Sequence, residues 1–412
     1  MPPRSALIVL VLLLVLAACG SKPDAAPPTL LPVADTVPAD AAALAAADDR
    51  FGVDLLASAP ATGNVALSPA SVAIALQMVA AGARGRTAAE LAHVLHGSST
   101  VPAAQALLGG LAATERDDTN TLRVANTVWT QRGMPVRQAF GTTLRTTFGA
   151  APRTADFQAD ADGARQEVNR TVAGQTNGMI RQLFPPGSLD GTTRLVLTNA
   201  IYLSASWARA FDPKDTTPGP FTLADGTVVR VPMMRATPDE PTDKTYGYAA
   251  GPGYQLVTLP YTGGRLAFTV LLPTGSPADL LKTMRDKGLP ALLDTVRPAG
   301  IALALPKFTI TSDLDLSRTL SGLGMPGAFG PGADFSGITT AEPLQLQTVR
   351  HDAVVRVDEH GTVAAAATGV GAQSTAMIVP PTVTVDRPFL FVITDTASGA
   401  PLFLGRVSDP RA

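Results

Sequence analysis

Four histidines, His93, His96, His351 and His360, are the side chains best suited to acid–base or metal chemistry in this sequence. His93 and His96 lie three residues apart on an expected helix, a spacing that can bind a metal ion. Only Glu90 lies near enough to contribute a further ligand, so we expect surface or capping roles for both histidines and no metal site. His-Glu-x-x-His, Gly-x-Ser-x-Gly and Gly-x-x-x-x-Gly-Lys motifs are all absent from the sequence, which lowers the expectation of catalysis.

The most informative stretch is 359–369, where small residues follow a predicted strand at 354–357. In an extended conformation its side chains alternate between two faces, and one face carries Thr362, Ala364, Ala366 and Thr368. All four are small and uncharged, so each could enter between parting strands without a clash or a desolvated charge. The alternative interpretations are a flexible alanine-rich loop and an ordinary surface helix.

The pattern Glu359-x-Gly361-Thr362-x-Ala364-Ala365-Ala366-Ala367-Thr368 resembles the hinge of inhibitory members of the serpin family. Similar motifs occur in family order from about residue 50 to residue 410: 64–71, 75–78, 82–87, 198–202, 207–211, 305–308, 333–337, 387–389 and 401–405. Each motif is weak alone, but their number and order make the resemblance specific. One departure is Thr171, which stands where the family often has an aromatic residue and is expected to loosen one helix packed on the sheet.

The resemblance implies a serpin-like α+β fold, with helices on a large mixed sheet, smaller sheets and an exposed reactive loop. It also implies a kinetically trapped native state. A serine protease attacks the loop and forms an acyl-enzyme, after which the cut loop inserts into the main sheet and distorts the protease before deacylation. On this interpretation the chain is not an enzyme, needs no cofactor and has no catalytic residue, because the nucleophile belongs to the target.

The resemblance also implies roles for residues outside the hinge. Four of them match a polar cluster beneath the centre of the sheet: Ser68, Ser71, Asn199 and His351. The alternative roles are helix capping for Ser68 and an ordinary satisfied core histidine for His351. Glu359 and Lys307 match a charge pair at the end of the sheet where insertion starts, with Trp207 packed beside them.

Two bonds are candidates for the cleaved bond. Counting 17 residues from Glu359, as inhibitory members usually require, places Thr375 before the cut and Ala376 after it. Counting back from Pro388 by the spacing of some relatives gives Met377 and Ile378 instead. We prefer the first, because the hinge length must match the sheet. Threonine suits elastase-like or subtilisin-like proteases and Met377 would also allow chymotrypsin-like ones, whereas the absence of Lys and Arg between residues 359 and 385 argues against trypsin-like targets.

The elements that position these residues follow from hydrophobic periodicity. Helices are expected from near Asp48, from Ser68-Pro69, from Thr87 and at 102–113, 136–148, 161–183, 277–293 and 313–323. Strands are expected at 122–131, 195–203, 228–234, 255–260, 266–272, 301–310, 353–357, 382–385, 389–394 and 401–407. Helices gather early and strands late, which predicts an α+β fold. No linker interrupts residues 50–410, so we expect one large domain at 48–412.

The N-terminus is typical of an export signal. Arg4 precedes an apolar run at 6–18, which is shorter than the ~20 residues of a membrane span and suits a signal peptide at 1–18. Leu16-Ala17-Ala18-Cys19 resembles the bacterial lipobox, so we expect a lipid on Cys19, the single cysteine. An ordinary signal peptide with a chance cysteine is the alternative. Residues 19–47, rich in Ala, Pro and Asp, are expected to form a flexible tether at the cell surface.

The composition of the chain limits the classes of molecule that it is expected to bind. The formal net charge is −2, without blocks of like charge, which argues against nucleic acid as the main partner. We therefore expect a monomeric, membrane-tethered protein whose partner is a serine protease. The alternatives are a non-inhibitory serpin-like carrier or chaperone and, more remotely, a solute-binding surface lipoprotein.

Overall fold

The computed structural model describes residues 41–97, 120–150, 152–176, 178–238, 244–362 and 381–412. Its central element is a six-stranded sheet in the order β12-β13-β14-β4-β2-β3. The strands are β12 (Phe308–Asp315), β13 (Thr348–Asp358), β14 (Gly361–Thr362), β4 (Leu195–Ser206), β2 (Asn120–Gln131) and β3 (Arg153–Ala155). The long strands β13 and β4 run parallel to each other, so this sheet is mixed.

Two further sheets complete the β structure. The seven-stranded sheet has the order β1 (Val65–Leu67), β17 (Pro401–Val407), β16 (Phe389–Asp395), β9 (Leu266–Pro273), β8 (Tyr254–Pro260), β7 (Tyr246–Gly251) and β10 (Arg297–Ala299). The four-stranded sheet has the order β15 (Thr382–Thr384), β11 (Ala302–Pro306), β6 (Val228–Ala236) and β5 (Thr217–Thr222). Their buried side chains share one large hydrophobic core with side chains of the six-stranded sheet and of several helices.

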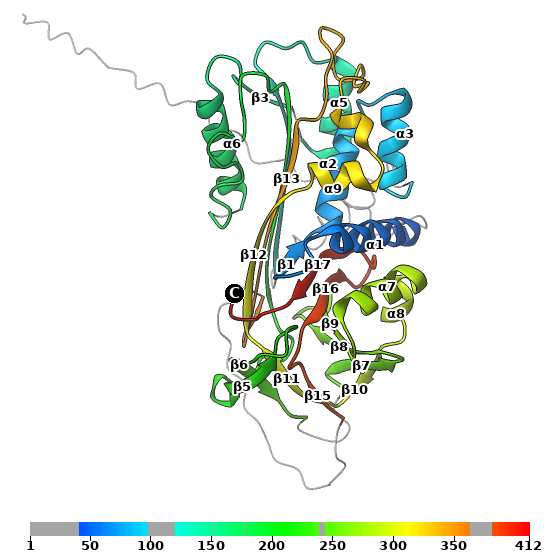
Figure 1. Cartoon of the computed structure of the whole chain (residues 1–412), viewed down its shortest axis with the longest axis vertical. Coiled ribbons are helices and arrows are strands. Elements are labelled where there is room, and N and C mark those ends of the chain that lie inside the picture. Colours follow the sequence, from blue (N-terminus) through cyan, green and yellow to red (C-terminus); the bar gives the residue numbers. More distant parts are fainter. Residues whose placement is uncertain (1–40, 98–119, 151, 177, 239–243, 363–380) are drawn as a thin grey trace, which may run out of the picture.

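The helices lie on both faces of the six-stranded sheet (Figure 1). One face carries α6 (Ala161–Gln175), and the other carries α1 (Ala41–Ser58), α2 (Pro69–Ala80), α3 (Gly85–Val94), α5 (Gln138–Phe148) and α9 (Ser317–Leu323). The remaining described helices are α7 (Pro277–Lys287), α8 (Leu289–Leu293) and the short 3₁₀ turns η1 (Pro213–Asp215) and η2 (Pro326–Phe329). The predicted α+β class is confirmed. Within the described residues, we find no helix long and apolar enough to cross a membrane.

Helix α2 begins where the sequence predicts. The Ser68 hydroxyl accepts a hydrogen bond from the Ser71 backbone N–H (3.2 Å), and Pro69 occupies the first turn, where a missing N–H costs nothing. The predicted apolar face is buried, and so is nearly every other residue of the helix, because small alanines let it pack closely under the sheet. Ser68 and Ser71 are thereby fixed beneath the strands.

Helix α6 packs on the opposite face of the sheet. Val168 and Val172 are buried in its small hydrophobic cluster. At the departure from the family pattern, the Arg153 guanidinium donates a hydrogen bond to the Thr171 hydroxyl (2.9 Å) and lies 5.5 Å from the centre of the Trp129 ring. The polar contact therefore joins α6 to the sheet at the position where we expected the helix to be loosened.

Two predicted helix boundaries were wrong. α1 begins at Ala41, so residues 41–47, which we expected in the tether, are helical. The prediction relied on the lack of large apolar side chains, but alanine has the highest helix propensity and Ala45 and Ala47 are buried. α6 ends at Gln175 rather than at residue 183, and Gly178 follows with a positive φ of +75° that a helix does not continue through.

Other segments are divided differently from the prediction. Residues 313–315 continue β12, whose pairing extends to Asp315 with Arg350, so the helix expected at 313–323 begins at Ser317. Gly288 (φ +82°) separates α7 from α8 within the helix expected at 277–293. The strand expected at 301–310 becomes β11 and β12, which belong to different sheets. The helix expected at 102–113 lies outside the described residues.

Candidate functional site

The site is the place where β13 and β4 part. Direct parallel pairing runs from Thr348 with Val196 to Ala353 with Ile201. Farther along, β14 lies between the two strands and pairs antiparallel with both, so that Thr362 stands opposite Val357 on β13 and Ala205 on β4. The first residues of the predicted hinge therefore already occupy a strand position inside the sheet.

Gly361 is required by the backbone at this point. Its φ of +151° is in a region that side chains disfavour, and a Cβ on this residue would lie 2.0 Å from the Ala205 carbonyl oxygen. Only glycine allows the chain to turn from β13 into β14 so close to β4. The resemblance assigned Gly361 to the hinge, and the geometry gives the physical reason for that residue type.

Thr362 points into the protein, as the alternation predicts. Its side chain is fully buried, and its hydroxyl lies 2.5 Å from the Tyr261 hydroxyl. The Tyr261 ring stacks on Trp207 with 4.6 Å between ring centres. Burial raises the pKa of Tyr261 far above its ordinary value, so the phenol remains protonated and able to donate to Thr362. The hinge residues Ala364, Ala366 and Thr368 and the candidate cleavage residues Thr375, Ala376, Met377 and Ile378 lie outside the described residues.

Glu359 is held by several contacts at the turn between β13 and β14. The Lys307 ammonium lies 2.6 Å from its Oε2, and the Thr216 hydroxyl donates to its Oε1 (2.9 Å). Burial raises the pKa of Glu359, but hydrogen bonds from Lys307 and Thr216 outweigh that effect and hold the pKa below its ordinary value. The Phe211 backbone N–H also donates to the Glu359 carbonyl (2.9 Å).

Trp207 lies beside this pair, as predicted from the resemblance. Its indole N–H donates to the Asp358 carbonyl and its backbone N–H donates to the His360 carbonyl, both at 2.9 Å. Lys307, Trp207 and Glu359 are therefore gathered around the start of β14. Sequence reasoning missed Thr216 and Tyr261, which contact the hinge from distant parts of the chain.

His351 lies at the centre of the sheet and is fully buried. Its Nε2 accepts a hydrogen bond from the Ser68 backbone N–H (2.9 Å), so the ring proton is on Nδ1, which donates to the Asn199 side-chain oxygen. Burial lowers the pKa of His351 to about 3. The histidine is therefore neutral and joins β13 to both β4 and α2.

Asn199 extends this cluster. Its amide nitrogen lies 2.5 Å from the Ser71 hydroxyl and 2.5 Å from the Asn126 side-chain oxygen. The structure thus brings Ser68, Ser71, Asn199 and His351 together, as the resemblance implied. Asn126 is an additional member that we missed. The sequence offered no clear signal for it, because Asn126 is one of several polar residues in the strand expected at 122–131 and its place opposite Asn199 follows from the strand register.

Of the other histidines, His360 lies in the turn before β14, where its carbonyl accepts from Trp207, whereas His93 and His96 lie away from this site. The His96 ring nitrogen Nε2 is 3.0 Å from an Asp54 carboxylate oxygen, just beyond the end of α3. In the part of the chain that the structure describes, no group of three His, Cys, Asp or Glu residues is arranged to hold a metal ion. The pairing of β14 with both β13 and β4 is suited instead to the entry of a strand between them.

Comparisons with known proteins agree with this architecture. The family model described as "Serpin (serine protease inhibitor)" matches residues 46–410. The human leukocyte elastase inhibitor is 33% identical, over 89% of this chain and 99% of that protein.

Solved structures of the same family also resemble this chain. Serpin48 of the insect Tenebrio molitor superposes with a TM-score of 0.78 at 29% identity, covering 89% of this chain and 98% of that one. Human thyroxine-binding globulin complexed with thyroxine gives a TM-score of 0.80 at 26% identity, covering 90% of this chain and 100% of that one. The family match spans most of the sequence, and the relatives are covered almost end to end. The chain belongs to the serpin family.

Proposed function

We propose that this protein is a suicide-substrate inhibitor of serine proteases with elastase-, subtilisin- or chymotrypsin-like specificity. The observation that carries the proposal is β14, the glycine-led start of the hinge, which lies between β13 and β4. Because two hinge residues already pair between β13 and β4, the residues that follow could extend the same strand in the same register. Cleavage would free the following segment to continue this pairing.

The driving force would come from the new strand. Each added ladder hydrogen bond contributes about 0.5–1.5 kcal/mol net, and a strand with neighbours on both sides forms two rows of them. The small side chains at Ala364, Ala366 and Thr368 would follow Thr362 into the interior without a desolvated charge. Insertion would carry the acylated protease away from the hinge end of the sheet.

The proposed cleaved bond is Thr375–Ala376, with Met377–Ile378 as the second choice. The small residue before the first bond fits the shallow specificity pocket of an elastase-like enzyme. The likeness to an elastase inhibitor supports the same class of target. The serine nucleophile, the acyl bond and the catalytic histidine would all belong to that protease.

The test is to mix the full chain with elastase, subtilisin and chymotrypsin and to analyse the products by denaturing electrophoresis and mass spectrometry. Inhibition predicts a covalent complex that survives SDS and a fragment beginning at Ala376. The matched control is each protease with its catalytic serine replaced by alanine, which should give no such complex. Cleavage with full recovery of protease activity would instead favour a non-inhibitory carrier or chaperone.

We also propose that the chain is exported and tethered to a bacterial membrane by a lipid on Cys19. The lipobox-like residues 16–19 support this proposal. In this arrangement the inhibitor would protect the cell surface from proteases in the surroundings.

A further inference from the structure

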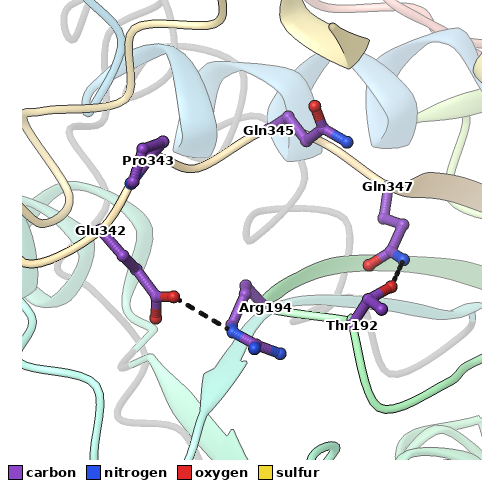
Figure 2. Close-up of a pocket in the computed structure, with 6 residues that line it drawn as sticks. All are labelled: Thr192, Arg194, Glu342, Pro343, Gln345 and Gln347. Carbon is purple, nitrogen blue, oxygen red and sulfur yellow. Dashed lines mark hydrogen bonds and ion pairs between the residues drawn. The ribbon is translucent and has the colours of Figure 1, made fainter. Parts of the chain in front are cut away.

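A polar pocket lies at the end of the six-stranded sheet opposite to β14. It has a volume of about 270 Å³ and is lined by Thr192, Arg194, Glu342, Pro343, Gln345 and Gln347. Figure 2 shows that these residues come from two facing chain segments. One segment leads directly into β4, which begins at Leu195, and the other leads directly into β13, which begins at Thr348. The pocket therefore marks the far end of the boundary between these two strands.

Two side-chain contacts cross this boundary (Figure 2). The Arg194 Nε lies 3.2 Å from Glu342 Oε2, and the Gln347 amide donates to the Thr192 hydroxyl (3.0 Å). The Thr192 hydroxyl in turn donates to the Asp190 carboxylate (2.6 Å). Hydrogen bonds from Thr192 lower the pKa of Asp190, so its negative charge orients the Thr192 proton and leaves the oxygen lone pairs for Gln347. We call the Arg194–Glu342 and Thr192–Gln347 contacts the far-end clasp.

The register of β14 locates the end of a fully inserted strand. Thr362 stands opposite Ala205 on β4 and Val357 on β13 in antiparallel pairing. A residue n places after 362 would therefore stand opposite 205 − n and 357 − n. For Thr375, n is 13, which gives Thr192 and Leu344. A strand that continues this register without a bulge up to the proposed cleavage residue would end at the pocket.

Full insertion is incompatible with the clasp. β13 and β4 are direct neighbours at this end, where Thr348 pairs with Val196. Neighbouring strands lie about 4.8 Å apart, so an inserted strand would move β13 and β4 to about twice that separation. Gln347 immediately precedes Thr348 and must move with it, which would carry its amide out of reach of Thr192.

We propose that the far-end clasp holds the last part of the sheet closed and slows the final stage of strand insertion. This inference rests on the proposed function, because it assumes that a strand enters between β13 and β4. The clasp lies at the end of the sheet opposite to the Lys307–Glu359 pair and to the hinge. It would act after the first residues have entered, when the growing strand reaches Thr192.

The test measures sheet opening without a protease. A synthetic peptide with the sequence of residues 363–375, which on this register spans from the hinge to the pocket, is incubated with the full chain. Its incorporation is followed by native gel shift and mass spectrometry. The variants are Glu342→Gln, Gln347→Ala and the double substitution. The matched control is Arg132→Gln, which removes an ion pair with Asp156 (3.6 Å) between the ends of β2 and β3, strands that stay on one side of the opening.

Loss of one partly exposed polar contact of this kind changes a rate by about 1.4- to 5-fold. We expect each single substitution to speed peptide incorporation about two- to fivefold and the double substitution about tenfold, with no change for Arg132→Gln. The urea midpoint of unfolding is measured for all four variants. If the contacts were merely structural, their loss would lower this midpoint without changing the rate of incorporation. Equal incorporation rates in the wild type, the clasp variants and the control would refute the clasp and leave the proposed function standing. Failure of the peptide to enter any of them would refute strand insertion itself, and the clasp with it.

Discussion

Thr362→Arg is the substitution that tests strand insertion most directly. Thr362 is fully buried, and its hydroxyl contacts Tyr261, whose ring is covered by Trp207. An arginine here would place a charge in a slot sized for a threonine, at a cost of several kcal/mol. We expect the variant to fold with the hinge displaced from the sheet, because Gly361 and Thr362 contribute a small part of the native pairing.

The magnitude follows from a competition between two rates. In the proposed mechanism, insertion must finish before the acyl-enzyme is hydrolysed, and a barrier raised by about 3 kcal/mol would slow insertion roughly 100-fold. Deacylation should then dominate, and the variant should be cut at the same bond while active protease is released. The assay is the number of inhibitor molecules consumed for each protease molecule inactivated. We expect this number to rise by one to two orders of magnitude.

Two control variants make the result interpretable. Thr362→Ser keeps the hydroxyl that contacts Tyr261 and should inhibit almost as well as the wild type. Val363→Arg changes the next residue, whose side chain should face solvent if the alternation continues, and it should have a much smaller effect than Thr362→Arg. Equal effects of arginine at the two positions would show that the assigned strand phase is wrong. Unimpaired inhibition by Thr362→Arg would show that inhibition does not require this side chain inside the sheet.

Three further predictions concern stability and localisation. Cleavage of the loop should raise the melting temperature measured by calorimetry, because the inserted strand adds pairing that the native state lacks; a cleaved form that melts at or below the intact form would contradict insertion. Burial, followed by the nearby Asp313 charge, raises the pKa of Asp352 to about 8, so the folded state holds a proton that the unfolded state loses near pH 4. Stability should therefore fall as pH rises from about 4 to 8, and Asp352→Asn should flatten this slope in urea titrations at several pH values. Labelled palmitate should enter the wild-type protein in a bacterial host and remain with membranes, whereas Cys19→Ala should abolish labelling; unlabelled, fully soluble wild type would refute the anchor.

The start of the hinge could be predicted from the sequence because its requirements are local, and its described part, Gly361 and Thr362, lies inside the sheet as the pattern predicts. A strand that enters a closed sheet needs small, uncharged side chains at alternate positions, and this pattern is visible in one short segment. Gly361 was recognised as a hinge residue by the family resemblance alone. Its physical cause, the close approach of the Ala205 carbonyl, depends on a strand far away in the sequence.

Residues whose roles depend on long-range pairing were not predictable in the same way. Tyr261 and Thr362 are 101 positions apart, and Asn126 and Asn199 are 73 positions apart. Without the register of the strands, a tyrosine just after the strand expected at 255–260 and an asparagine inside the strand expected at 122–131 give no indication of these partners. The early start of α1 was missed for another reason, since its alanines have high helix propensity but little apolar surface.

The distribution of charge along the boundary between β13 and β4 is consistent with a sheet that can open. At the centre, His351 and Asn199 connect the strands through a neutral hydrogen bond, because burial keeps the histidine uncharged. At the far end, an ion pair crosses the boundary between Arg194 and Glu342, whose side chains are 22% and 39% exposed, whereas Lys307 and Glu359 at the hinge end both lie on the β12–β13 side of it. Separating a buried ion pair would leave an uncompensated charge in the core, whereas Arg194 and Glu342 could be hydrated as they separate. The proposed opening would therefore break a neutral contact in the middle of the sheet, and its electrostatic cost would arise at the far end, where solvent reduces it.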